Sequence, residues 1–220
     1  MKIVYTYIFG KHDWLRTPTK VTPGWRYVCF TDTPDNVWPK SMERQTWEVI
    51  QVPSDQDTPK RTAGYYLTHS ANLFPEAEII VSVIGMGRIV GDLDGFVMKN
   101  LKRDYCLMRH PARVCTYSEG QAVISYKKDK PENVNPQMDR YKAEGLPVNH
   151  GMVQTGVIGR RNSDSVKEFE RLWWEEIKNE SQRDQLSFNY CLWKHPDIIK
   201  VDTFDPNKLG EFVALCPHRG

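Results

Sequence analysis

The feature that most constrains the fold of this chain is the segment EIIVSVI at 78–84, which is apolar at all but its glutamate and its serine. A strand that is apolar along nearly its whole length is buried on both faces, as in the parallel sheets of α/β proteins. The segment ends in Gly85-Met86-Gly87, and Gly91 follows four residues later. Ligands of open α/β sheets bind beyond the carboxyl ends of the strands. The glycine turn is therefore the first place to look for a functional site.

Segments of strand and helix character alternate along the rest of the chain. Apolar, β-branched and aromatic runs predict strands at 2–9, 25–32, 47–52, 78–84, 105–110, 151–160 and 197–202. Helical spacing and capping residues predict helices at 59–74, 92–101, 163–177 and 183–194, and two short helices within 118–145. This alternation indicates an α/β fold, Rossmann-like, with a mainly parallel central sheet flanked by helices.

Composition narrows the class of protein. A length of 220 residues fits one domain spanning 1–220, and 40% apolar residues suffice for a core. The net charge of +2 gives no general field for nucleic acid, and no apolar run is long enough for a membrane span. The cysteines are five in number and contain no C-x-x-C pair, which favours reduced thiols and a cytoplasmic location.

The glycine turn itself admits a dinucleotide-binding interpretation. Gly85, Gly87 and Gly91 resemble the glycine fingerprint of NAD(P)-dependent oxidoreductases. However, the third glycine comes one residue late, and Asp92-Leu93-Asp94 looks like a helix that begins only there. A fingerprint helix would already be under way near Gly87. A glycine turn that binds no ligand is the remaining plain alternative.

Several phrases, in order along the chain, carry a resemblance to a known family. They are YVCFTD, LFPEAEIIVSVIGMGRIVGDLDGF, HPARVCTYSEG, QTGVIGRRNS and WWEEIKNESQRDQLSFNYCLWK. Together they resemble a glycosyltransferase-like family first catalogued as a domain of unknown function, whose best-known members are plant proteins of seed mucilage and pollen-tube wall. More distantly, the layout is similar to that of the GT-A nucleotide-sugar transferases. The resemblance implies a GT-A-like domain that binds a nucleotide sugar, expected to be a UDP-sugar, and a carbohydrate or other hydroxyl acceptor.

The sequence departs from this family where GT-A enzymes hold Mn²⁺ or Mg²⁺ in an Asp-x-Asp motif. The corresponding residues here are Ile84-Gly85-Met86, which offer no side-chain oxygen to a hard cation. Three explanations stay open: Arg61 and Arg88 neutralise the leaving diphosphate without metal, Asp92 and Asp94 supply a displaced metal site, or catalysis has been lost and binding kept. We assign no metal ligand from the sequence, because the six histidines show no H-x-x-x-H spacing.

The resemblance also implies roles for individual residues. Asp184 is the candidate catalytic base toward the acceptor hydroxyl, although a carboxylate at a helix start needs no such role. Asp32 is expected to meet a uracil ring or ribose, or else only to cap a turn. The donor-side candidates are Tyr7, Lys11, Asp32, Arg61, Gly85, Arg88 and Gln185. The candidates on the acceptor or sugar side are His110, Arg113, Glu119, His150 and Thr155, of which His110, Arg113 and Glu119 could equally form a structural network.

Overall fold

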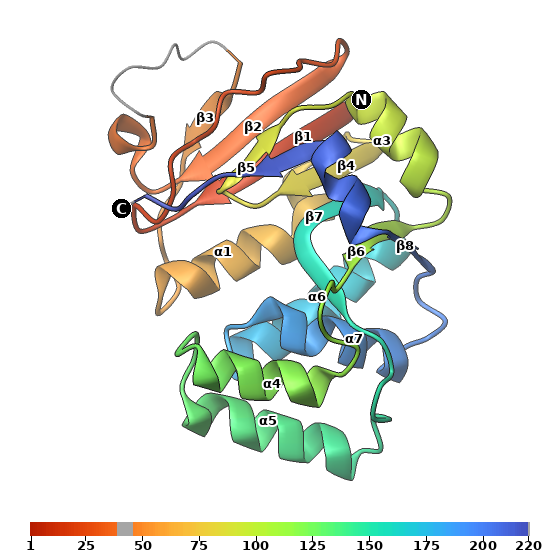
Figure 1. Ribbon diagram of the computed structural model, residues 1–220. Coiled ribbons are helices and arrows are strands. Elements are labelled where there is room, and N and C mark those ends of the chain that lie inside the picture. Colours follow the sequence, from red (N-terminus) through yellow and green to blue (C-terminus); the bar gives the residue numbers. More distant parts are fainter. Residues whose placement is uncertain (39–45, 220) are drawn as a thin grey trace.

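A seven-stranded sheet forms the centre of the protein in the computed structural model, which describes residues 1–38 and 46–219 (Figure 1). The strand order is β3-β2-β1-β4-β7-β6-β8. Only β7 is antiparallel to its neighbours, and the other adjacent pairs in this sheet are parallel. The predicted α/β fold with a mainly parallel sheet is therefore confirmed. The strands are β1 (Lys2–Ile8), β2 (Trp25–Thr31), β3 (Glu48–Gln51), β4 (Ile79–Val83), β6 (Tyr105–Arg109), β7 (Val153–Arg161) and β8 (Val201–Phe204).

Helices cover one face of the sheet. The innermost are α1 (Pro59–Thr68), α2 (Ser70–Leu73), α6 (Asp164–Asn179) and α7 (Asp184–Lys194). The pair α4 (Thr116–Ser125) and α5 (Pro131–Ala143) packs outside α7 (Figure 1). Ser163 caps α6, as expected, and Trp173 and Trp174 of this helix are buried in the core. Two faces of apolar side chains thus meet here, which is what a sheet face and an amphipathic helix stripe require.

The opposite face carries α3 (Leu93–Asn100) and a two-stranded ribbon of β5 (Gly87–Ile89) and β9 (Val213–Leu215). Two short 3₁₀ turns, η1 (Pro34–Asn36) and η2 (Pro206–Glu211), complete the regular elements of the described chain. Asp92 caps α3 by accepting a hydrogen bond from the Gly95 amide at 2.7 Å. Asp94 accepts from Lys2 Nζ and from Trp25 Nε1. Both carboxylates are committed to these contacts, so the idea of a displaced metal site at Asp92 and Asp94 gains no support.

The ribbon corrects the dinucleotide interpretation of the glycine turn. After β4 the chain enters β5 and not a helix, so no helix N-terminus follows to receive a pyrophosphate. A Cβ on Gly87 would lie 2.5 Å from Val83 Cγ1, and a Cβ on Gly91 would lie 2.1 Å from the Glu211 carbonyl oxygen. A side chain at Gly87 would collide with β4, and one at Gly91 would collide with the segment before β9, so close packing requires glycine at both positions.

A buried charged pair lies in the interior, between Arg160 of β7 and Glu170 of α6, whose charged atoms are 3.0 Å apart. Arg160 also donates to Ser82 Oγ, to the Leu67 carbonyl and to Tyr105. Glu170 accepts from the Ser70 hydroxyl and the Ala71 amide at the start of α2, and from the Tyr105 hydroxyl. This carboxylate explains why the expected helix over 59–74 is broken at His69: it caps a second, separate helix.

Candidate functional site

The ends of several elements meet at one edge of the sheet. Strands β1, β2 and β4 end there, and β7, which runs the other way, begins there. Helix α1 begins next to this edge, because a Cβ on Gly10, just after β1, would lie 2.9 Å from Pro59. Helix α7 begins there too, since Asp184 contacts Thr155 of β7. This edge, which we call the carboxyl edge, is where the fold predicts a ligand to bind.

The turn Ile84-Gly85-Met86 lies at the middle of the carboxyl edge. Ile84 donates its amide to the Gly156 carbonyl at 2.8 Å, and the Gly87 amide closes the turn on the Ile84 carbonyl at 2.7 Å. The side chains at the two outer positions are aliphatic, so the turn does not fit the metal of an Asp-x-Asp motif. A Cβ on Gly85 would lie 3.0 Å from Asp13 Oδ2. A carboxylate therefore lies beside the turn, but it comes from another part of the chain.

Asp184 is held firmly on the helix side of the turn. Thr155, itself only 5% exposed, donates its hydroxyl to Asp184 Oδ2. Trp173 Nε1 donates to the Asp184 carbonyl at 3.1 Å, which fixes the start of α7 against α6. Among the described residues Asp184 Oδ1 has no hydrogen-bond partner, which leaves one carboxylate oxygen able to accept a proton.

The loop before α7 is anchored at two points. Asp129 accepts hydrogen bonds from the Ser181 hydroxyl and the Gln182 amide. Thr58 at the start of α1 donates to Gln182 Oε1 at 2.7 Å. The predicted donor-side residue Gln185 lies one residue past Asp184 and donates to the Val153 carbonyl at 3.4 Å. These contacts set the position of α7 relative to α1 and β7.

Two cations close to Asp184 are not neutralised by an ion pair. Burial, followed by the charge of Arg183, lowers the pKa of Lys60 to about 8. Lys60 makes no hydrogen bond or ion pair with any residue that the structure describes. Arg183 Nε is buried and likewise has no hydrogen-bond partner in that part of the chain. Both residues are half-buried, and partial burial of an unpaired charge carries a cost that an anionic ligand would offset.

A hollow of about 670 Å³ opens next to these cations. Its walls come from the start of α1, from the segment between α4 and α5, and from Gln182. Lys127, Lys128 and Lys130 line it, and Lys128 is close enough to Lys60 to act on its charge. Its volume is within the range of small-molecule sites, and its lining carries more basic than acidic residues, because Asp57 and Asp129 stand against these lysines and Arg61.

Arg61 lines the same hollow, and its expected contact with the donor phosphates stays a prediction. Its guanidinium donates to the Ile177, Lys178 and Glu180 carbonyls at the end of α6, and pairs with Asp57 at 2.8 Å. Arginine at that place satisfies the free carbonyls of a helix C-terminus. The cation that α1 offers to the carboxyl edge is its neighbour Lys60, which the sequence analysis passed over.

The remaining donor-side candidates of the first two strands also lie at the carboxyl edge. Burial, with Tyr5 and Asp184 nearby, raises the pKa of Tyr7 well above its ordinary value, so its hydroxyl stays neutral. Asp32 accepts from the Gly10 amide at 3.1 and 3.2 Å and thereby holds the loop after β1. Gly10 and Lys11 adopt left-handed φ angles of 64° and 59°, and Lys11 is exposed. A structural role for Asp32 is thus visible, and its contact with a base or ribose stays a prediction.

The other candidates are spread more widely. Arg88 lies in β5, opposite Ala214, and its Nε is buried without a hydrogen-bond partner among the described residues. His110, Arg113 and Glu119 bind one another: Arg113 pairs with Glu119, and His110 Nδ1 accepts the Arg113 amide at 2.9 Å. Burial and Arg113 lower the pKa of His110. The network fastens the loop after β6 to α4, and an acceptor-side role for it stays a prediction.

His150 lies in the segment just before β7. It lines a second hollow, of about 500 Å³, together with residues of the end of α7 and the start of β8. The start of β8 pairs with the start of β6, at the opposite end of the strands from the carboxyl edge. The residues around His150 thus come from both ends of the strands, and its role on the sugar side stays a prediction.

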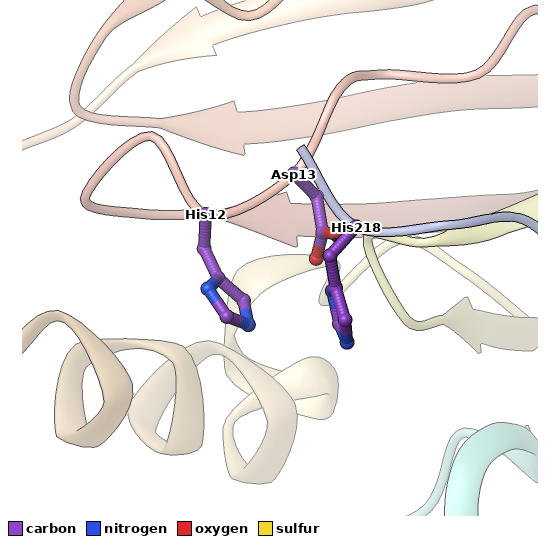
Figure 2. A group of neighbouring side chains, drawn as sticks. All are labelled: His12, Asp13 and His218. Atoms are coloured by element: carbon purple, nitrogen blue, oxygen red, sulfur yellow. Dashed lines mark hydrogen bonds and ion pairs between the residues drawn. The ribbon is translucent and has the colours of Figure 1, made fainter. Parts of the chain in front are cut away.

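Beside the turn, three residues that were not among the predicted site residues come together (Figure 2). His12 and Asp13 lie in the loop after β1, and His218 comes from the C-terminal segment. The His218 ring hydrogen-bonds to Asp13 Oδ1 at 2.7 Å, and the centroids of the two histidine rings are 4.7 Å apart. Local spacing could not reveal the group, because 205 residues separate Asp13 from His218.

A comparison with protein-family models identifies the family of the chain. The family model described as "TOD1/MUCI70, glycosyltransferase-like domain" matches residues 1–218. No curated protein matches the chain. Among the helices that the structure describes, none has the length and apolar character needed to cross a membrane.

Proposed function

The chain belongs to the TOD1/MUCI70 glycosyltransferase-like domain family, and we propose that it binds a nucleotide sugar, in the first instance a UDP-sugar, at the carboxyl edge and transfers the sugar to an acceptor hydroxyl. The observation that carries this proposal is the group of charged side chains around Asp184 that make no ion pair with any described residue. Among the described residues, Lys60 makes no ion pair, Arg183 Nε has no hydrogen-bond partner, and Asp184 Oδ1 accepts no hydrogen bond.

The proposed chemistry divides between a base and two cations. Asp184 Oδ1 takes the proton of the acceptor hydroxyl, whose oxygen forms a bond to the anomeric carbon of the sugar. The bond between that carbon and the diphosphate oxygen breaks, and the electron pair leaves with the diphosphate. Lys60 and Arg183 stabilise the negative charge that develops on it. Thr155 keeps Asp184 in place throughout by its hydrogen bond to Oδ2.

Binding of the nucleotide part would use the ends of β1 and β2. Tyr7 offers an aromatic ring and a neutral hydroxyl at the end of β1, and Asp32 offers acceptor oxygens at the end of β2. Ligand contact at these strand ends is the general rule for open α/β sheets. The cationic hollow beyond Lys60 is then available to the acceptor or to the diphosphate.

The test is a titration of the protein with UDP, with NAD and with NADP, followed by thermal unfolding, in buffer with a chelator and in buffer with Mn²⁺. The proposal expects a rise in the unfolding temperature with UDP and none with NAD or NADP. Release of UDP from a panel of UDP-sugars, with and without simple acceptors, then separates an active transferase from a member that only binds. A shift with NAD alone would reject the proposal.

A further inference from the structure

The group of His12, Asp13 and His218 has the composition and the compactness of a metal site. One ligand atom from each residue can be chosen so that all three lie within 4.8 Å of one another. Figure 2 shows the three side chains directed to the same side of the loop after β1. Two imidazoles and one carboxylate form a donor set that suits divalent transition metals such as Mn²⁺, Co²⁺ and Zn²⁺.

The burial of Asp13 is the strongest reason to expect a cation at this group. It is 5% exposed, and among the described residues its carboxylate has no lysine or arginine partner. Its one partner there is the ring of His218. A buried carboxylate is expensive unless it is paired or coordinates a metal. The plain alternative is an Asp13–His218 ion pair with no metal, in which the exposed His12 ring only packs against the His218 ring.

His218 is held in position although it lies close to the end of the described chain. The Cys216 amide donates to the Met86 carbonyl at 2.9 Å, and Arg16 donates to the Pro217 carbonyl at 2.6 Å. On its other side, the Arg219 guanidinium lies 3.6 Å from the ring centroid of Trp14, an arrangement that is attractive in itself. Residues 216–219, which we call the C-terminal strap, therefore lie across the turn and hold His218 next to Asp13.

The group of His12, Asp13 and His218 lies next to the turn at which GT-A enzymes hold their metal ion. Asp13 Oδ2 lies 3.0 Å from the position of a Cβ on Gly85, at the turn whose own side chains offer no oxygen ligand. We propose that His12, Asp13 and His218 bind one divalent transition-metal ion next to this turn, with ligands recruited from the first loop and from the C-terminal strap. Three protein ligands leave further coordination positions open. That these positions receive oxygens of the donor diphosphate rests on the proposed function, whereas metal binding itself does not.

The test is calorimetric titration of the full chain with Mn²⁺, Co²⁺ and Zn²⁺ in the absence of nucleotide, together with the visible absorption of the cobalt form. The expected result is saturable binding of one equivalent and a cobalt spectrum characteristic of nitrogen and oxygen ligands. His12→Gln, Asp13→Asn and His218→Gln should each weaken binding by about tenfold or more. His195→Gln serves as the matched control, because His195 lies at the end of α7, outside the group.

The results distinguish this proposal from the proposed function. The metal site would be overturned if the wild-type protein showed no saturable metal binding, or if all three variants bound the metal as tightly as the wild type does. Either result would leave UDP binding untouched. Metal binding that is lost in the variants while UDP gives no response would support the site and reject the proposed function. A fold control by circular dichroism ensures that loss of binding in a variant reflects loss of a ligand.

Discussion

Two groups of charged residues differ in how far their charges are paired within the protein. One is the Arg160–Glu170 pair in the interior, and the other is the group of Lys60, Arg183 and Asp184 at the carboxyl edge. Arg160 uses its donors on Glu170, Ser82, the Leu67 carbonyl and Tyr105, all within the protein. At the carboxyl edge, by contrast, Lys60 has no partner among the described residues, and Arg183 Nε is buried without one.

This contrast distinguishes charged residues that stabilise the fold from charged residues that are available to bind a ligand. A buried polar network with every member satisfied makes the core rigid. Burial raises the pKa of Tyr105 well above its ordinary value, so its hydroxyl stays protonated and donates to Glu170. At the carboxyl edge the same low polarity lowers the pKa of Lys60 to about 8 and keeps its charge in need of an anion.

Breaking the interior pair should give the largest effect. Arg160→Met leaves Glu170 buried without its cation, so we expect a loss of about 3–5 kcal/mol in the free energy of unfolding. Urea unfolding followed by circular dichroism measures it. Arg161→Met is the matched control, since Arg161 is exposed, and it should change stability by less than about 1 kcal/mol. Equal stability of both variants would contradict the structural role of the pair.

At the carboxyl edge the effect should fall on activity and not on stability. Asp184→Asn keeps the shape and the hydrogen bond with Thr155 but removes the base, so sugar transfer should fall by about a hundredfold or more. Asp164→Asn is matched to it, because Asp164 is also the first residue of a helix, α6. Initial rates with a UDP-sugar and an acceptor would show the difference. An active Asp184→Asn protein would remove the residue from the mechanism.

A smaller effect is expected from the cation of α1. Lys60→Gln removes one charged contact to the diphosphate, which is worth about 1.5–3 kcal/mol, so UDP affinity should fall at least roughly tenfold. Its stability should be unchanged or higher, because the native environment disfavours the charged amine. The exposed Lys167→Gln on α6 is the control, and calorimetry on both variants is the measurement.

The smallest effect is a pH dependence of the same contact. UDP is fully ionised above about pH 7, because the second phosphate pKa is about 6. As the pH rises through about 8, Lys60 loses its proton and its charge, so UDP affinity should decline. The decline should be absent in Lys60→Gln. A wild-type profile that stays flat from pH 7 to 9 would mean that Lys60 does not meet the phosphates.

The fold was more accessible from the sequence than the site was. Local apolar patterns predict strands such as β1 and β4, and an apolar pattern together with a capping residue predicts the helix α6. The ribbon of β5 and β9 does not, since each strand has three residues and their pairing spans most of the chain. Likewise Asp184 and Thr155 were predicted as site residues, whereas the approach of His218 to Asp13 depends on the path of the C-terminal strap.

Arg61 and Lys60 illustrate the limit most clearly. Both are basic residues in the first turn of α1, and sequence alone gives no reason to prefer the second. The choice is made by tertiary structure, because the end of α6 places three carbonyls within reach of Arg61 and leaves Lys60 near Asp184. The rotation of a helix about its axis is set by packing, which the sequence encodes only through distant partners.

The most direct test of the contrast is amide hydrogen exchange, measured by mass spectrometry on the full chain with and without saturating UDP. The account predicts slower exchange in the loop after β1, at the end of β2 and at the starts of α1 and α7, with no change around Arg160 and Glu170. Unchanged exchange at all four segments, or protection confined to the hollow beside His150, would contradict the assignment of the carboxyl edge as the nucleotide-sugar site.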